Sequence, residues 1–177
     1  MKNLIYLMIA VLVFASCKNE VPKDYVTLQG KITNPNSDSL VIKGKDDYKK
    51  VIKVKEDGTF KDTLKVAPNY FTLFDGKEYA TLYLKNGFDI NLSLDTKEFD
   101  ETITFDGNGK EANSFLARSA LMQEDIFEND SLFALDKDAF TNKLDTYVDK
   151  FNSDLESTQN LDSIFIADQH NFIEGFK

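Results

Sequence analysis

The sequence predicts an α+β fold, in which an N-terminal antiparallel β-sandwich or partly open barrel of about eight strands is followed by about three helices. Between residues 25 and 106, apolar and polar side chains alternate with the period of two that is typical of half-buried strands. After residue 106, apolar residues recur at helical spacing instead. No helical stretch interrupts the strands, so we expect them to pair mainly in the antiparallel direction.

The first region is divided into strands by turn signals rich in Gly, Asn, Asp and Pro. These signals are Asn34–Ser37, Glu56–Gly58, Asp75–Gly76 and Asn86–Gly87. Strands are therefore expected at residues 25–33, 39–43, 49–55, 59–66, 70–75, 79–85, 88–95 and 102–106. In the first strand, Val26, Leu28 and Ile32 share one face, which indicates that this face is buried.

Three helices are expected after a loop at Asp106–Gly109. The second should begin at Asp136, a favourable N-cap residue, and end near Glu156, and the third should begin near Asp162. Their apolar stripes are, in order, Ala112, Phe115, Leu116, Ser119, Met122 and Ile126; Phe140, Leu144, Tyr147, Val148, Phe151 and Leu155; and Phe165, Phe172, Ile173 and Phe176. Because the last stripe continues to the penultimate residue, we expect the helical segment to be incomplete and a further domain to follow.

The N-terminal residues are expected to export and anchor the protein. A positive start and a short apolar run that ends in small residues are typical of a secretory signal. Cys17 follows directly and resembles the lipidated cysteine of bacterial lipoproteins; the alternative is an ordinary signal or anchor helix with an incidental cysteine. Lys18 is not the aspartate of the inner-membrane retention signal, which favours the outer membrane. The predicted organisation is a signal peptide at 1–16, a lipidated tether at 17–24, a β domain at 25–106 and a helical segment at 107–177.

Composition excludes several classes of function. The chain has 177 residues, with 21 Lys plus Arg against 30 Asp plus Glu and a net charge of -9. Such an acidic chain is a poor partner for nucleic acid, whose phosphates need Lys and Arg. One cysteine and one histidine exclude an internal disulfide and a CxxC redox pair, and make a zinc enzyme unexpected. We therefore predict no catalytic residue, no metal and no cofactor, and we do not expect this chain to be an enzyme.

Other candidate motifs have a simpler structural interpretation. His170 lacks a nucleophile partner, so we expect it to face solvent on the third helix. The stretch Asp106–Glu111 fails as a calcium loop because its fifth position is Lys110. A glycosidase would need two converging carboxylates, and most of the candidates lie in turns or on polar strand faces. These candidates are Asp46, Asp47, Asp57, Asp75, Asp89, Asp95, Asp100, Glu101, Glu124 and Asp125.

Two groups of strand residues are candidate binding surfaces. Tyr70, Tyr79 and Tyr83 either form an exposed platform on which a sugar stacks or pack within the sheet, and we favour packing. A lysine-rich pair of neighbouring strands either contacts an anionic membrane or glycan or protects a strand edge from aggregation, and we favour edge protection. The lysines are Lys43, Lys45, Lys49, Lys50, Lys53 and Lys55.

Three stretches, together with the Cys17 boundary, resemble one known family. The stretches are YVTLQGKITN (25–34), KVKEDGTFKDTLKV (53–66) and FDGNGKEANSFLA (105–117). They are similar to the N-terminal half of bacterial lipoproteins that end in a thioredoxin-like domain of the TlpA or peroxiredoxin type. In that family, a β domain of unknown function and a helical linker precede a reductase domain with a WCxxC motif. The resemblance transfers no catalytic residue, because Cys17 is the only cysteine.

The resemblance implies that this chain is the anchor, spacer or recognition region of a thiol–disulfide oxidoreductase whose redox domain lies outside it. A second hypothesis is a stand-alone surface lipoprotein that binds glycan or peptide, and a third is a hydrolase with paired carboxylates. The expected location is the cell envelope, as an outer-membrane lipoprotein that faces the periplasm or the surface. The expected partners are the membrane through lipid on Cys17, a downstream thioredoxin-like domain, and an envelope protein or glycan.

Overall fold

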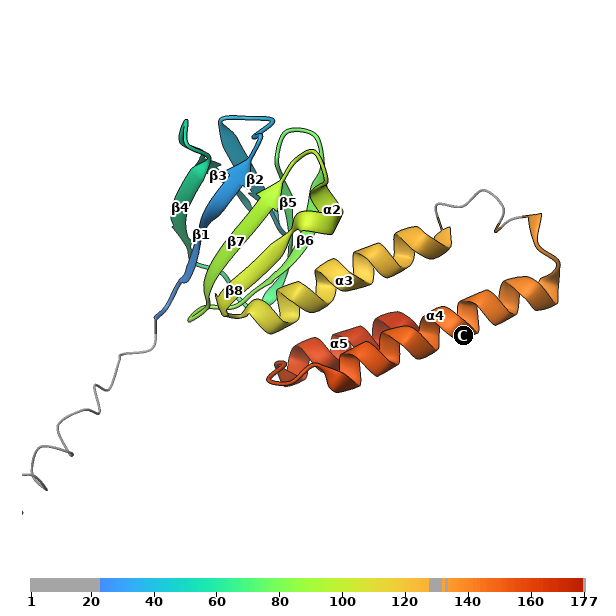
Figure 1. Ribbon diagram of the computed structural model, residues 1–177. Coiled ribbons are helices and arrows are strands. Elements are labelled where there is room, and N and C mark those ends of the chain that lie inside the picture. The colour runs from blue at the N-terminus through green and yellow to red at the C-terminus, as the bar shows by residue number, and fades with distance from the viewer. Residues whose placement is uncertain (1–22, 128–131, 133, 177) are drawn as a thin grey trace, which may run out of the picture.

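A computed structural model describes residues 23–127, 132 and 134–176 of the chain. In this range eight strands precede three long helices, which confirms the predicted α+β class (Figure 1). The strands are β1 (Val26–Thr33), β2 (Ser39–Lys43), β3 (Lys49–Lys53), β4 (Thr59–Leu64), β5 (Asn69–Phe74), β6 (Tyr79–Leu84), β7 (Asp89–Asp95) and β8 (Thr104–Asn108). The helices are α2 (Phe99–Thr102), α3 (Lys110–Phe127), α4 (Lys137–Ser157) and α5 (Ser163–Glu174).

The strands form two packed sheets and do not close into a barrel, so of the two predicted architectures the sandwich is the correct one. One sheet has the order β4-β1-β7-β8 and the other has the order β3-β2-β5-β6. All pairs within the sheets are antiparallel except β1 with β7, which run parallel. The chain passes between the sheets from β3 to β4, where a bridge joins Val54 to Phe60. On the opposite side, α3 contacts both β6 and β8.

The segment between β7 and the long helices differs from the prediction in two ways. A one-turn helix, α2, interrupts the strands, although no helical stretch was expected there. Four residues are too few to produce a helical spacing of apolar side chains, so the pattern carried no signal for it. In addition, residues 106–108 belong to β8, where a loop was predicted. The chain can stay beside β7 at Gly107 because φ is +87° there, and a Cβ would lie 2.1 Å from the Asp89 carbonyl oxygen.

The sandwich and the helices have separate hydrophobic cores. The sandwich core is mostly aliphatic and includes the predicted face of Val26, Leu28 and Ile32. The core of the helical part is mostly aromatic, and it contains Tyr83 from β6 together with residues of α3, α4 and α5. Its most buried rings are Tyr83, Phe115, Tyr147, Phe151 and Phe165.

The long helices begin where the sequence predicts. Asp136 caps α4, and its Oδ1 accepts a hydrogen bond from the Ala139 N–H at 2.9 Å. Asp162 caps α5 in the same way, through the Ile164 N–H at 2.9 Å. Most residues of the predicted stripes are buried or half-buried, and Phe172 of α5 is 43% exposed. The half-buried ones are Leu116, Met122, Phe140, Leu144 and Phe176.

Candidate functional site

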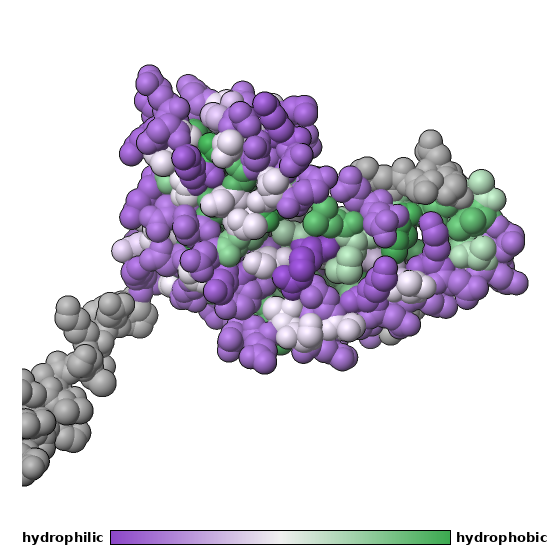
Figure 2. Space-filling view, in the orientation of Figure 1, coloured by the Kyte–Doolittle hydropathy of each residue, from purple (hydrophilic) through white to green (hydrophobic). Residues whose placement is uncertain are grey.

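A groove lies where β5, β6 and the α2–β8 segment meet α3 and α5, and we call it the sheet–helix groove. Its volume is about 420 Å³, which lies in the range of pockets that hold small molecules or peptide side chains. Figure 2 shows apolar side chains gathered in this region, between the sandwich and the helices. The lining residues are Tyr70, Tyr79, Ala80, Thr81, Asp100, Ile103, Phe105, Leu116, Ala117, Ser119, Ala120, Gln123, Asp168, Gln169 and Phe172.

Asn113 fixes α3 to β6 at one end of the groove. This side chain is completely buried in the first turn of the helix. Its Oδ1 accepts from the Tyr83 N–H, and its Nδ2 donates to the Tyr83 carbonyl, both at 3.0 Å. Nδ2 also donates to the Gly109 carbonyl at 2.8 Å. Buried backbone groups must be paired, and Asn113 pairs those of Tyr83 as a neighbouring strand would. These bonds hold α3 beside the edge of β6.

Asp162 fixes α5 to the same strand. Its carboxylate caps the helix and also forms an ion pair with Lys85, which follows β6 directly. The Tyr83 hydroxyl donates to the other carboxylate oxygen at 3.4 Å. The hydrogen bond from Lys85 lowers the pKa of Asp162, against the opposing effect of partial burial. The carboxylate thus stays charged and joins α5 to the sandwich.

Tyr70 is one of the polar residues that line the groove. Gln169 of α5 donates to the Tyr70 hydroxyl at 2.9 Å, and the two side chains come from parts of the chain 99 residues apart. Burial raises the pKa of Tyr70 to about 12, and the nearby Asp168 carboxylate contributes to this rise. Tyr70 therefore remains a neutral hydroxyl at physiological pH. It can donate a hydrogen bond to a bound group, but it is unsuited to act as a base.

The walls of the groove carry acidic residues. Asp100 and Asp168 line it, and an adjoining hollow shares Asp100, Ala120 and Gln123 with it and adds Glu124. Among the described residues that line the groove and this hollow, none is Lys or Arg. The lining of the groove therefore combines apolar side chains with carboxylates.

The three candidate tyrosines share one face of the sheet but do not form an exposed platform. Tyr83 is 1% exposed, and its ring packs against Phe165 at a centroid distance of 5.1 Å. Tyr70 is half-buried beneath α5. Tyr79 alone of the three is largely exposed, at 58%, and it stacks on Phe74. The favoured interpretation, packing, is correct for Tyr83 and Tyr70, because helices cover this end of the sheet.

The candidate lysines and histidine lie away from the groove. Four of the six lysines lie in the paired strands β2 and β3, and β3 is an edge strand of its sheet. Lys43 lies directly opposite Lys49, and Lys50 forms an ion pair with Asp62 at 3.0 Å. His170 is exposed on α5, as expected. None of these residues lines the groove.

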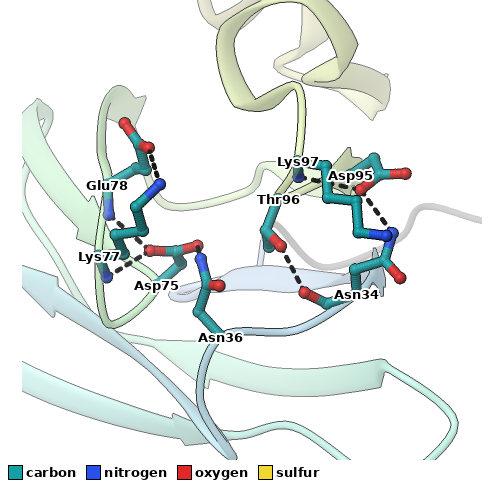
Figure 3. A network of polar contacts seen from close by, with 8 residues as sticks. All are labelled: Asn34, Asn36, Asp75, Lys77, Glu78, Asp95, Thr96 and Lys97. Atoms are coloured by element: carbon teal, nitrogen blue, oxygen red, sulfur yellow. Dashed lines mark hydrogen bonds and ion pairs between the residues drawn. The ribbon is translucent and has the colours of Figure 1, made fainter.

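Several candidate carboxylates serve as caps for turns (Figure 3). Asp75 is buried and accepts from the Lys77 and Glu78 N–H groups at 2.8 and 2.7 Å, and from Asn36 Nδ2 at 2.8 Å. Asp95 accepts from Asn34 Nδ2 at 2.8 Å and from a backbone N–H. These bonds tie the β1–β2, β5–β6 and β7–α2 connections together at one end of the sandwich.

Outside these caps, two of the candidate carboxylates, Asp100 and Glu124, line one hollow. Asp57 caps its own turn through Thr59, and Asp89 pairs with Lys23. Within residues 23–127, 132 and 134–176, no three His, Cys, Asp or Glu side chains lie close enough to hold a metal ion. Of the candidate carboxylates, Asp100 lines the groove and Glu124 lines the hollow beside it.

The predicted lipidation site cannot be placed, because Cys17 and the signal peptide lie outside the described residues. None of the helices in the described part of the chain is long and apolar enough to cross a membrane. Lipid attachment and location in the envelope therefore stay predictions.

Asn113 and Gln169 were not identified as site residues from the sequence. Each is a buried polar residue on a helix face that packs on the sandwich. The available signal was a polar side chain next to apolar stripe positions, at Asn113 after Ala112, and such a side chain must find a partner if it is buried.

No family model, curated protein or solved structure matches this chain. The resemblance to thioredoxin-like lipoproteins thus rests on the sequence patterns alone.

Proposed function

We propose that this chain is the non-catalytic anchoring and recognition region of an exported lipoprotein, and that it binds a partner in the sheet–helix groove. The observation that carries the proposal is that the sandwich and the helices build the groove jointly. Asn113 attaches α3 to β6 and Asp162 attaches α5 to Lys85 directly after it, which supports a preformed groove. Largely preformed, mostly apolar hollows with a few polar groups are typical of binding sites.

The resemblance to thioredoxin-like lipoproteins suggests that the bound partner is a substrate protein of the redox domain. In a thioredoxin-like lipoprotein, the helices would hold the redox domain at a distance from the membrane, and the groove would hold a substrate protein near it. The lipid on Cys17 would keep the assembly in the envelope, since several acyl chains anchor a protein stably.

Lipid attachment is tested by metabolic labelling with an alkyne-tagged fatty acid in the native cells. The wild-type protein should be labelled and should sediment with outer membranes. Cys17→Ser should remove the label, because the thioether bond to diacylglycerol cannot form. Ser16→Ala, which keeps a small residue before the cysteine, is the matched control and should retain the label. A label that persists in Cys17→Ser would contradict the anchor.

The redox association is tested by the size of the native protein. An immunoblot against residues 25–106 should give a band larger than the 20.1 kDa of this chain by a whole domain, typically about 100–150 residues. A native band near 20.1 kDa would reject the association with a redox domain in the same chain and would favour a stand-alone binding lipoprotein.

A stand-alone glycan-binding lipoprotein is the second candidate, and one observation favours it. The Tyr79 ring is exposed beside the groove and is held by stacking on Phe74 at a centroid distance of 4.5 Å. Flat aromatic surfaces of this kind can stack on sugar rings. Binding on a glycan array that disappears in Tyr79→Ala but survives in Tyr79→Phe would support this candidate. Identical array profiles for wild type and Tyr79→Ala would reject it.

A further inference from the structure

β6 is the edge strand on the groove side of its sheet, so one side of its backbone faces away from β5. The hydrogen bond from Asp75 N–H to the Glu78 carbonyl marks a bonded pair at the hairpin end. Since bonded and non-bonded pairs alternate in an antiparallel ladder, the N–H and C=O groups of Tyr79, Thr81 and Tyr83 point outward.

These three outward positions differ in whether their backbone groups have hydrogen-bond partners. At Tyr83, Asn113 supplies one acceptor and one donor, as a neighbouring strand would. At Thr81 and Tyr79, no group among the described residues bonds to the outward N–H or C=O. Both residues are exposed and line the sheet–helix groove. The edge is thus satisfied at its C-terminal end and open at its N-terminal end.

We propose that this open edge of β6 accepts an extended, positively charged segment of a partner protein as an additional β-strand. The inference rests on the proposed binding role of the groove and names the class of partner. An extended peptide presents N–H and C=O groups at every second residue, at the same spacing as Thr81 and Tyr79. Its alternate side chains would contact Phe105 and Leu116, which line the groove.

The charge of the groove selects the partner. Asp100 and Asp168 line the groove, Glu124 lines the adjoining hollow, and no Lys or Arg lies among the described lining residues of either. A basic segment is therefore attracted and an acidic one repelled. A second copy of this chain is disfavoured as the occupant, because each copy carries a net charge of -9.

The test uses three fluorescein-labelled heptapeptides and the full mature chain at low salt. The first alternates lysine and valine, the second alternates glutamate and valine, and the third is the lysine peptide with N-methyl groups on alternate backbone nitrogens. Methylation removes the donors that an added strand requires but keeps the charge and the side chains. Binding is measured by fluorescence anisotropy. The position of the bound peptide is measured by changes in the amide signals of Leu116 and Ala120 in NMR spectra.

We expect the lysine peptide to bind at least tenfold more tightly than the other two and to shift both amide signals. Thr81→Pro removes the outward N–H and should weaken binding about tenfold, whereas Thr81→Val keeps the N–H and should bind like wild type. Circular dichroism checks that both variants are folded. If Thr81→Pro does not fold, the methylated peptide still tests the backbone hydrogen bonds on the wild-type chain.

Two outcomes would overturn the inference. Equal binding of the methylated and unmethylated lysine peptides, with shifts at Leu116 and Ala120, would show that the groove binds without adding a strand; the proposed function would survive. Absence of any shift or anisotropy change with all three peptides would reject the basic peptide as the partner class. Neither result bears on the lipid anchor, which the Cys17→Ser labelling tests separately.

Discussion

The sandwich and the helical part are stabilised in different ways. The sandwich core collects small and medium aliphatic side chains from all its strands except β8, and no single side chain dominates it. The helical core depends on a few large aromatic rings, of which Phe115, Phe151 and Phe165 make edge-to-face contacts. It is attached to β6 of the sandwich by the polar contacts of Asn113 and Asp162 and by the Tyr83 ring, which packs on Phe165.

This difference indicates an order of dependence between the two parts. Tyr83 of β6 belongs to the helical core, whereas β1 and β7 form the middle of a sheet that the sandwich core covers. The helices therefore need the sandwich as a template, but most of the sandwich does not need the helices. The groove lies at this junction, so its shape depends on both parts.

The largest effect should follow from loss of a ring in the helical core. Phe115 is fully buried between Phe151 and Phe165, so Phe115→Ala should cost about 3–5 kcal/mol. Hydrogen exchange should show that the amides of α4 and α5 lose protection while those of β1 and β7 keep it. Phe60→Ala, a matched substitution in the sandwich core, should reduce protection in both parts. Equal loss in both parts for Phe115→Ala would mean that the chain unfolds as one unit.

A smaller effect should follow from loss of the Asn113 side chain. Asn113→Ala leaves the buried Tyr83 N–H and C=O without partners, which should cost about 2–3 kcal/mol in denaturant unfolding. The Tyr83 amide should exchange much faster than in the wild type. Asn108→Ala removes an exposed bond to the Gly87 carbonyl and should cost under about 1 kcal/mol. Similar losses of unfolding free energy in the two variants would show that the buried bonds of Asn113 stabilise the fold no more than an exposed bond does.

The sequence predicted most of this fold because strands and long helices carry repeated signals. Eight strands, three long helices and both helix caps, Asp136 and Asp162, were expected within a few residues of their observed bounds. The patterns did not indicate α2, the extension of β8 or the parallel pairing of β1 with β7. A single helical turn is too short to show a period, and strand alternation is the same for either direction of pairing.

The groove was harder to predict than the fold. It is formed by residues far apart in the chain, such as Tyr70 and Gln169, and no local motif brings them together. The tyrosine pattern did indicate a shared sheet face, but it could not indicate that helices cover one end of it. Lipidation of Cys17 was predicted from a local boundary in the sequence and stays a prediction.

The smallest expected effect is on the pH dependence of stability, and it tests the contribution of the Asp162–Lys85 ion pair beside β6. Because Lys85 lowers the pKa of Asp162, the folded chain keeps this carboxylate charged at pH values where the unfolded chain is protonated. Its contribution, about 1 kcal/mol, should be complete above the ordinary aspartate pKa of 3.8 and lost as the pH falls through the lowered value. Asp162→Asn keeps the helix cap but should abolish this part of the acid sensitivity in thermal unfolding.

The control for this prediction is Glu156→Gln, which removes an exposed carboxylate of α4 and should leave the acid profile unchanged. An Asp162→Asn profile that coincides with the wild type between pH 5 and pH 2 would contradict the proposed electrostatic attachment of α5.

The central position of β1 also has a mechanical consequence. The chain enters the sandwich through this strand, which pairs with β4 over six residue pairs and with β7 over seven. Tension applied at the N-terminal end therefore pulls β1 along its own axis, and it must shear both ladders at once instead of unzipping one bond at a time. A protein held to a membrane by its N-terminus would carry drag and thermal forces through this strand. The β1–β4 and β1–β7 ladders of the sandwich would be the first to bear that load.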